Sequence, residues 1–257
     1  MNNINYLNNI GSITTIILAA GKGSRMNCDI PKVLVKICDK PMIEYVIDNI
    51  NPLSNKIIMI VGYKSQMIKD FIENISFDKN ITFVNQEQQL GTGHAVLQAK
   101  HLFNQIESTI LVMMGDAPLI TTEILNDFIN YHKMNNNYVS LLTTHTSYEN
   151  KCSRILRDQN KNFKYIIEAK DINDSELWNI DETSTGTFLF ESKDLFSKLE
   201  KISNNNSQHE YYLGDVLNEY ISDNIDIDIG VYKTNKLNNI YSANTVDELN
   251  EIKKYLN

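Results

Sequence analysis

The chain has 257 residues, a length that fits one large domain or two small ones. Its apolar fraction of 42% and charged fraction of 22% are those of an ordinary globular protein, which excludes a disordered chain and a coiled coil. The net charge is −8 at pH 7 and no basic run is present, which argues against a nucleic-acid-binding protein, because phosphate neutralisation supplies most of that affinity.

The cysteine and hydropathy patterns indicate the compartment. Cys28, Cys38 and Cys152 are widely spaced and form no CxxC pair, which predicts reduced thiols rather than a disulfide framework or a zinc site. No stretch reaches about 18 apolar residues, so no membrane span is expected. Residues 1–11 are rich in Asn and lack the basic and apolar segments of a secretory signal. We therefore expect a cytoplasmic protein with a polar N-terminal extension, folded from residue 12 onward.

Strand-like and helix-like segments alternate through the first half of the chain. In order, the sequence predicts a strand at Ile13–Leu18, a helix at Pro41–Ile50, a strand at Lys56–Val61, a helix at Ser65–Ile75, a strand at Ile81–Val84, a helix at Gly93–Phe103, a strand at Thr109–Met114 and a helix at Thr121–Met134. Thr121 or Thr122 is the expected N-cap of the last helix. The alternation predicts βαβ units and a mainly parallel sheet, which binds ligands beyond the carboxyl ends of its strands.

Helices become fewer beyond Tyr138. The sequence predicts strands at Tyr138–Thr144, Arg154–Arg157, Phe163–Ile167, Thr185–Phe190 and Asp226–Tyr232, and helices at Asp194–Lys201, Tyr212–Ile221 and Val246–Leu256. Asp171–Thr183 is a polar excursion, and Asn244 lies in the N-cap region of the last helix. No linker or repeat interrupts the chain, so residues 12–257 are predicted to form one α/β domain.

The first motif with chemical meaning runs from Leu18 to Met26 and is followed by Pro31–Leu34. Two glycines after a strand let backbone amides approach phosphates, and Arg25 and Lys32 add positive charge. The third glycine of a dinucleotide fingerprint is missing, and no P-loop is present. The alternative is an ordinary strand–helix turn with surface cations.

A second motif, Gln89–Ala95, brings two glycines and a threonine to the start of a helix. Gln86 and Gln89 carry amides that can both donate and accept, as the imide of a uracil requires. The alternative is a hairpin-like turn followed by an N-cap. We expect His94 to be a helix residue without a catalytic role.

Acidic and amide side chains follow predicted strands in both halves. Asp116 comes after an apolar strand, where a lone acid caps a helix as often as it binds a metal. Asn244 is open to the same two interpretations, N-cap or ligand. Glu168 and Lys170 taken alone would be a solvated strand edge.

Together these motifs resemble the sugar-1-phosphate nucleotidyltransferases, in particular the uridylyltransferase half of the bacterial N-acetylglucosamine-1-phosphate uridylyltransferase/glucosamine-1-phosphate acetyltransferases. The similarity runs in family order through LAAGKGSRM, PKVL, QLGTGHA, GDAPL, EAKD and NNNSQHEYY. The resemblance implies a Rossmann-like nucleotidyltransferase fold with helices on both faces of the sheet. It also implies a nucleotide-binding half at about 12–137 and a sugar-binding half at about 138–257.

The resemblance carries over roles residue by residue. It implies catalytic roles for Arg25 and Lys32, and Mg²⁺ as cofactor with Asp116 and Asn244 as ligands. It implies a nucleotide site formed by Leu18, Ala19, Ala20, Gly21, Gly23, Gln86, Gln89, Gly91, Thr92 and Gly115, and a sugar site formed by Ser153, Glu168, Ser184 and Tyr212. The implied reaction converts UTP and N-acetyl-α-D-glucosamine 1-phosphate into UDP-N-acetylglucosamine and pyrophosphate. The alternatives are a related enzyme that uses another sugar phosphate or CTP, and a catalytically silent nucleotide-binding module.

The chain departs from the family pattern mainly around the sugar. Lys151–Arg154 replaces a Gly-Tyr-Gly-Arg turn, Ser184–Gly186 replaces Asn-Thr-Gly, Gly214 replaces a threonine, and Met114 replaces an aromatic residue. We therefore expect the same reaction with weakened discrimination among sugars. The acetyltransferase β-helix of the resembled family has no counterpart in the sequence, so no acetyl-CoA chemistry is expected.

Overall fold

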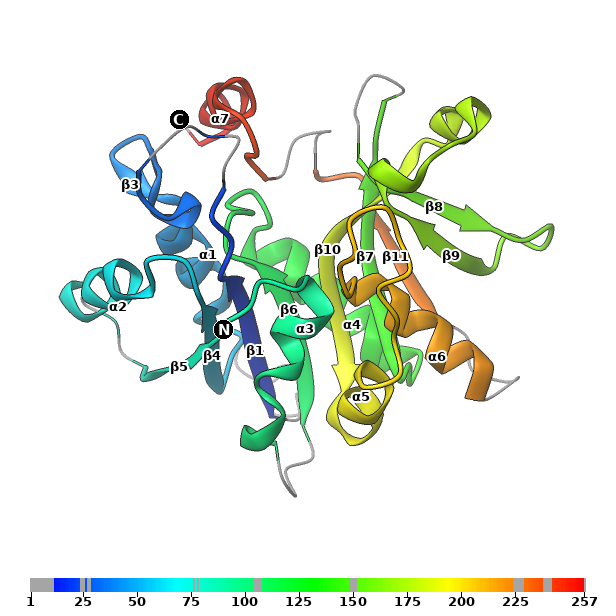
Figure 1. Cartoon of the computed structure of the whole chain (residues 1–257), viewed down its shortest axis with the longest axis horizontal. Helices are drawn as coiled ribbons and strands as arrows, with labels where there is room; N and C mark the ends of the chain where they lie inside the picture. Colours follow the sequence, from blue (N-terminus) through cyan, green and yellow to red (C-terminus); the bar gives the residue numbers. More distant parts are fainter. Residues whose placement is uncertain are drawn as a thin grey trace, which may run out of the picture.

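A seven-stranded sheet forms the centre of the molecule (Figure 1). Its spatial order is β11 (Gly230–Thr234), β7 (Val139–His145), β10 (Glu182–Glu191), β6 (Thr109–Met114), β1 (Ile13–Ala19), β4 (Lys56–Val61) and β5 (Ile81–Asn85). Neighbouring strands are parallel except at β10, which runs antiparallel to both β6 and β7. The predicted α/β class with a mostly parallel sheet is confirmed.

The computed structural model describes residues 12–23, 26, 29–75, 77, 79–103, 108–147, 152–223, 229–237 and 242–256. Arg25, Cys28, Lys151 and the N-terminal extension lie outside the described residues, as does the first part of the strand predicted at Asp226–Tyr232. Among the described residues, no helix is long and apolar enough to cross a bilayer.

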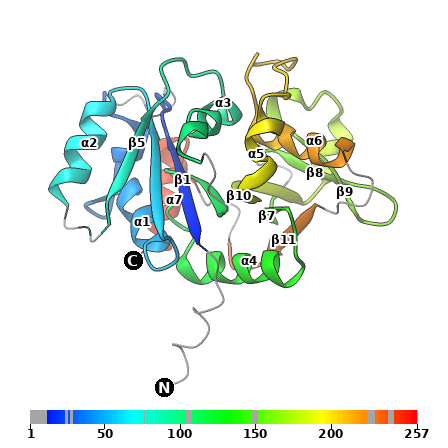
Figure 2. The ribbon, with the colours of Figure 1, turned by 90° about the horizontal axis from the view of Figure 1, so that it is seen from below.

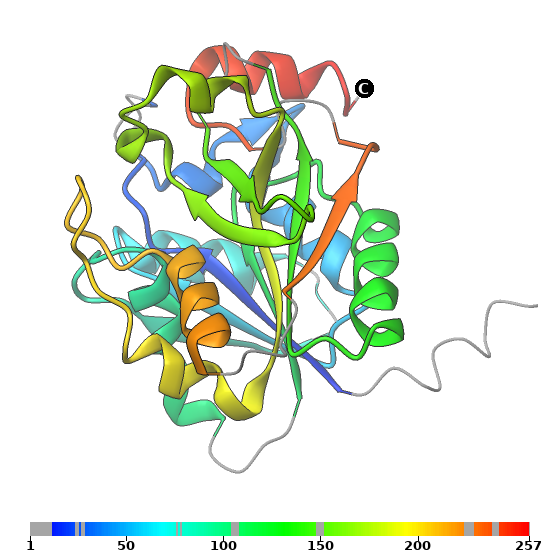
Figure 3. The ribbon, with the colours of Figure 1, turned by 90° about the vertical axis from the view of Figure 1, so that its right-hand side faces the viewer.

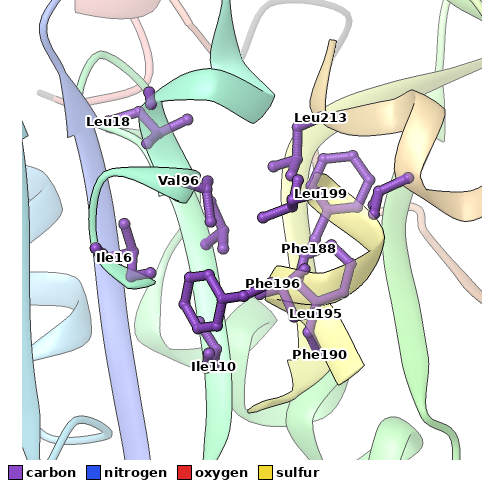
Figure 4. Packing of buried hydrophobic residues seen from close by; sticks show 14 of the residues in the cluster. Ile16, Leu18, Val96, Ile110, Phe188, Phe190, Leu195, Phe196, Leu199 and Leu213 are labelled. Carbon is purple, nitrogen blue, oxygen red and sulfur yellow. The ribbon is translucent and has the colours of Figure 1, made fainter. Parts of the chain in front are cut away.

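Helices cover both faces of the sheet (Figure 2). α3 (Thr92–Leu97), α5 (Ser192–Leu199) and α6 (Val216–Asp223) pack on one face, whereas α1 (Met42–Ile50), α2 (Ser65–Asn74) and α4 (Thr122–Met134) pack on the other. Alternate residues of β1 serve the two cores: Ile16 points to the first and Ile17 to the second. Figure 4 shows the first core, where Val96 of α3 and Phe196 of α5 meet the sheet. One sheet therefore carries both halves of the chain.

Several shorter elements complete the fold. They are the 3-10 turn η3 (Lys32–Leu34), the hairpin of β2 (Lys36–Ile37) and β3 (Lys40–Pro41), the ribbon of β8 (Arg154–Arg157) and β9 (Phe163–Ile167), the 3-10 turns η5 (Ala169–Asp171), η6 (Ser175–Asn179) and η7 (Leu213–Asp215), and the helix α7 (Val246–Lys253). In Figures 1 and 3 the β8–β9 ribbon and α7 both lie at the end of the sheet where β1 ends. The last segment of the chain thus returns to the first half.

Several element boundaries differ from the sequence-based expectation. β10 begins at Glu182 instead of Thr185, because buried threonines extend the strand into the expected polar excursion. The helix expected at Gly93–Phe103 ends at Leu97 and gives way to the 3-10 turn η4 (Lys100–Leu102). The N-cap of α7 is Thr245, whose Oγ1 accepts from the amide of Glu248 at 3.2 Å, and not Asn244. The Asn244 side chain is therefore not used as a helix cap.

Candidate active site

A cavity of about 770 Å³ lies between the two halves at this end of the sheet. Its walls include Leu18 and Thr92 from the first half and Ser153, Glu168, Ser184 and Asn244 from the second. These six residues come from all three predicted groups: nucleotide, sugar and metal. The other predicted site residues within the described part of the chain do not line this cavity.

Lys32, Asp116 and Asn244 meet at one point. The Lys32 ammonium forms an ion pair with Oδ2 of Asp116 and donates to Oδ1 of Asn244 at 2.8 Å. The ion pair is largely enclosed, since the side chains of Lys32 and Asp116 are 12% and 10% exposed. Oδ1 of Asp116 is buried and has no hydrogen-bond partner among the described residues. Side-chain oxygens of Asp116 and Asn244 thus converge on the Lys32 ammonium, and the second oxygen of the Asp116 carboxylate is unpaired. Oxygen ligands of this kind suit a hard metal ion such as Mg²⁺.

Backbone geometry places Lys32 and Asn244 for this contact. Gly23 has a φ of +64°, and a Cβ there would lie 2.5 Å from Cβ of Lys32, so only glycine lets the two segments approach. Asn244 is held by α7, because the Glu248 carboxylate accepts from the Asn244 backbone amide while the Thr245 hydroxyl caps the same helix.

The end of β6 is fixed against the end of β1. The Gly115 amide donates to the Leu18 carbonyl at 2.9 Å, and a Cβ at Gly115 would lie 3.1 Å from that oxygen. Asp116 therefore follows a strand whose last hydrogen bond is made to the start of the glycine-rich loop. In that loop, a Cβ at Gly21 would meet no heavy atom within 4 Å, so the space beside its backbone is open.

The Gln89–Ala95 motif is paired with the second half of the chain. The Tyr211 amide donates to the Leu90 carbonyl and the Gly93 amide donates to the Tyr211 carbonyl, both at 2.8 Å. The Thr92 hydroxyl accepts from the Leu213 amide at 2.9 Å. Gly91 has a φ of +111°, and a Cβ there would lie 2.6 Å from the Tyr211 carbonyl oxygen. The glycines of this motif thus serve close packing as well as the nucleotide site that the sequence predicts.

Carboxylates crowd the predicted sugar side. Glu168 follows β9 and lies beside Asp171 and Asp215. Burial, with the charges of Asp215, Asp171 and Glu210 adding to it, raises the pKa of Glu168 to about 7. Burial and Asp171 raise the pKa of Asp215 to about 6.

Tyr212 does not line the main cavity. It lines a smaller hollow of about 250 Å³ behind Glu168, which is shared with Asp215. Its hydroxyl accepts from Nε2 of Gln208 at 2.8 Å, and Gln208 does line the main cavity. Burial raises the pKa of the Tyr212 phenol to about 12, so the group stays protonated.

The two serines expected near the sugar also make contacts within the protein. Oγ of Ser153 lies 3.1 Å from Oγ1 of Thr183, and Oγ of Ser184 accepts from the Gly186 amide at 3.0 Å. Gly214 lines the cavity too, and a Cβ there would lie 3.1 Å from Cδ1 of Ile166. The smaller residue at this position therefore allows β9 to approach η7.

Sequence reasoning assigned no role to Trp178 or Arg154. Trp178 lines the cavity, and its ring lies 4.8 Å from Cζ of the fully buried Arg154 guanidinium. Arg154 also donates to the carbonyls of Cys152, at 2.8 Å, and Ser147, at 3.1 Å. It thereby ties the 152–153 turn to the Trp178 wall. In the sequence, the indication that this segment lines a site is that the single tryptophan of the chain lies inside a polar excursion.

Sequence comparisons find relatives over most of the chain. The sequence model of the MobA-like NTP transferase domain family matches residues 15–217. The Bifunctional protein GlmU of Streptococcus mutans is 41% identical over 221 residues, which are 85% of this chain and 46% of that protein. The GlmU of Bacillus cereus is 41% identical over 203 residues, 79% of this chain and 43% of that protein. The chain thus spans less than half the length of the curated relatives it matches.

A solved structure gives the same fold. UDP-glucose pyrophosphorylase complexed with UDP-glucose superposes with a TM-score of 0.75, covering 95% of this chain and 98% of that chain at 17% identity. At this level of identity the likeness concerns the fold alone.

Proposed function

This chain belongs to the MobA-like NTP transferase domain family and is a nucleotidyltransferase, and on that premise we propose that it transfers a uridylyl group from UTP to N-acetyl-α-D-glucosamine 1-phosphate. The products are UDP-N-acetylglucosamine and pyrophosphate. The proposal covers residues 12–257 as one catalytic domain, with a nucleotide-binding half at about 12–137 and a sugar-binding half at about 138–257.

One observation carries the proposal. Lys32, Asp116 and Asn244 are far apart in the sequence, yet they converge at the carboxyl end of the parallel strands. This is where parallel sheets bind ligands. The 41% identity to GlmU proteins supports the choice of uridine nucleotide and amino sugar over other members of a broad family.

The reaction needs positioning and charge stabilisation from the protein. An oxygen of the sugar phosphate attacks the α-phosphorus of UTP in line, the new P–O bond forms, and the bond to the β-phosphate breaks as pyrophosphate leaves. A phosphate monoester is mostly ionised near neutral pH, with a second pKa of about 6, so no general base is required. Lys32, Arg25 and the amides of Gly21 and Gly23 would stabilise charge on the departing pyrophosphate.

Asp116 and Asn244 are the residues that would hold Mg²⁺. The unpaired Oδ1 of Asp116 and the side-chain amide oxygen Oδ1 of Asn244 are ligands that suit this ion. When bound, the ion would neutralise phosphate charge and orient the reacting groups. Glu168 would accept hydrogen bonds from sugar hydroxyls, and Ser153, Ser184 and Tyr212 would complete the sugar site.

The test is pyrophosphate release measured for each of four nucleoside triphosphates with each of three acceptors, in the presence of Mg²⁺. The acceptors are the 1-phosphates of N-acetylglucosamine, glucosamine and glucose. We expect the highest kcat/KM for UTP with N-acetylglucosamine 1-phosphate. A higher kcat/KM with CTP or with glucose 1-phosphate would show that the reaction type is correct but the proposed substrates are wrong. No pyrophosphate release from any pair would indicate a catalytically silent nucleotide-binding module.

A further inference from the structure

The Gln86 amide is held from two sides at the start of α3. Gln86 is 3% exposed, and its Nε2 lies 3.1 Å from the Gly91 carbonyl oxygen and 3.0 Å from Nδ1 of His94. Because a carbonyl oxygen only accepts hydrogen bonds, the Gly91 contact requires the nitrogen end of the amide to face α3. Both N–H groups of Gln86 are then engaged inside the protein, whereas its Oε1 makes no hydrogen bond to the described residues.

The same contact determines the state of the His94 ring. A nitrogen that accepts from Gln86 must carry a lone pair, so Nδ1 is unprotonated and the proton of a neutral ring is on Nε2. Burial lowers the pKa of His94, and a hydrogen bond with the Gln88 backbone opposes this in part. The net lowering favours the neutral ring.

A second amide competes for the ring. Nε2 of Gln98 lies 3.1 Å from Nε2 of His94 and donates to the His94 carbonyl at 3.0 Å. A neutral imidazole accepts at only one nitrogen, so one of the two amides must turn. Gln98 is only partly buried, and its amide can rotate to present its oxygen to the ring N–H. Turning costs either amide its bond to a backbone carbonyl, Gly91 for Gln86 and His94 for Gln98. Gln86 is almost fully buried, whereas the partly exposed Gln98 can exchange its lost bond for water, so we expect Gln98 to be the amide that turns.

We propose that His94 is a positioning residue for base selection: together with the Gly91 carbonyl, it accepts from Gln86 and so presents the carbonyl end of that amide to the pyrimidine. This inference rests on the proposed function. N3 of uracil carries a hydrogen and can donate to Oε1, whereas N3 of cytosine is an acceptor and would face that oxygen lone pair to lone pair. The ring therefore favours uridine over cytidine nucleotides without touching the base.

The first test measures the ring in the free protein. ¹⁵N spectra of histidine-labelled protein separate protonated from unprotonated ring nitrogens, and the His94→Asn variant identifies the signals of His94. We expect Nε2 to be protonated and Nδ1 to be bare at pH 7.5. A proton on Nδ1 would overturn the inference, and this result does not depend on whether any substrate is turned over.

The second test measures nucleotide choice as the ratio of kcat/KM for UTP to that for CTP. His94→Phe removes one of the two contacts that hold the Gln86 amide and leaves the Gly91 carbonyl alone to orient it, so we expect the ratio to fall about tenfold, mainly through KM for UTP. His94→Asn keeps an oxygen that can accept from Gln86, so most of the ratio should return. His101→Phe is the matched control, because His101 is exposed on η4 and its ring hydrogen-bonds only to the Gln98 carbonyl among the described residues.

The outcomes of the two tests separate the two proposals. An unchanged ratio in a folded His94→Phe variant would refute the positioning role, while wild-type turnover of UTP would still support the proposed function. If the wild type used no uridine nucleotide, the proposed function would fail, and the base-selection role would fail with it even if the ring tautomer were as expected.

Discussion

Asp116 holds one carboxylate oxygen against the Lys32 ammonium and keeps the other buried without a partner among the described residues. A buried acceptor left unpaired costs about 1–3 kcal/mol of folding free energy. Neither the fold nor the Lys32 ion pair uses this oxygen. An arrangement that tolerates such a cost is typical of a ligand site, and it agrees with the role that the sequence predicts for Asp116.

Replacing this carboxylate should remove most of the activity. We expect Asp116→Ala to lower kcat/KM by a factor that corresponds to about 3–5 kcal/mol of transition-state stabilisation. The loss should be smaller for Asn244→Ala. Steady-state rates of pyrophosphate release give these values. Asp48→Ala is the matched control, since Asp48 is exposed on α1 and, within the described part of the chain, pairs with Lys40 alone. Activity of Asp116→Ala within a few fold of the wild type would remove the metal assignment.

Glu168 makes the stability of the protein depend on pH. Its pKa rises from 4.5 in the unfolded chain to about 7 in the fold. Below pH 4.5 the group is protonated in both states and has no effect. Between pH 4.5 and 7 only the folded state keeps the proton, so the free energy of unfolding decreases as pH rises, and above pH 7 the full penalty is present.

Removing the charge should therefore stabilise the free protein at alkaline pH only. We expect Glu168→Gln to be more stable than the wild type by at most about 3 kcal/mol at pH 8, and equal to it at pH 4. Urea unfolding at both pH values measures this difference. Glu73→Gln, on the exposed side of α2, should show no difference at either pH. A Glu168→Gln variant less stable than the wild type at pH 8 would contradict the burial of a charged carboxylate.

Position 184 should set sugar preference. The hydroxyl of Ser184 accepts from the Gly186 amide and lines the cavity. The oxygen of an asparagine there can keep that bond while its NH₂ group reaches the sugar. We expect Ser184→Asn to raise the preference for N-acetylglucosamine 1-phosphate over glucose 1-phosphate by about tenfold, corresponding to roughly one hydrogen bond. Ser184→Ala should not raise it, and an unchanged ratio in Ser184→Asn would mean that this position does not contact the sugar.

At the scale of elements, β10 contains an irregularity at the cavity. Its register with β7 shifts between Ser184 and Thr187, and Gly186 adopts a φ of +73°. A Cβ at Gly186 would lie 3.0 Å from Cγ of Met114, which ends β6 and also lines the cavity. The bulge turns the strand so that Ser184 and Thr185 both line the cavity.

This bulge should tolerate no side chain. We expect Gly186→Ala to destabilise the protein by about 1–3 kcal/mol, because alanine is strained at positive φ and meets Met114. Chemical denaturation measures the loss. Gly21→Ala is the control for stability, since open space surrounds its Cβ position and its φ is ordinary. Equal stability of the two variants would show that the bulge relaxes at no cost.

The sequence predicted most elements, because their apolar periods are strong. β4, β6, β8 and β9 have the predicted bounds, and Thr121 caps α4 as expected. It could not predict the bulge at Gly186, which depends on the neighbouring Met114. Composition and periodicity do not predict the contact between Lys32 and Asn244, 212 residues apart, since it depends on the tertiary packing of α7; only the family resemblance assigns both residues to the active site. The roles of the individual site residues stay predictions.

At the scale of the whole molecule, the two halves share one sheet and the apolar core on the face that α3 covers. The pair β6 and β10 joins them, with Val112 opposite Phe188 and Ile110 opposite Phe190. The same core includes α3 from the first half and α5 from the second. Neither half can separate without exposing this shared apolar surface.

We therefore expect the halves to unfold together. Hydrogen exchange of the central amides of β1 and of β7 should report the same opening free energy and the same dependence on urea. Buried amides on both sides of the β6–β10 pair provide the comparison. Faster exchange of β7 and β10 at a lower free energy would instead divide the chain into two cooperative units.

The single tryptophan of the chain stands in the cavity wall, against the buried guanidinium of Arg154. The intrinsic fluorescence of Trp178 can therefore report binding at the candidate sugar site without any label. A sugar that displaces water from this wall should shift the Trp178 emission toward the blue, whereas a nucleoside triphosphate alone should leave its wavelength unchanged. Titrating each substrate separately while following this one signal would distinguish occupancy of the two halves, and a shift caused by UTP alone would place the nucleotide next to Trp178 instead.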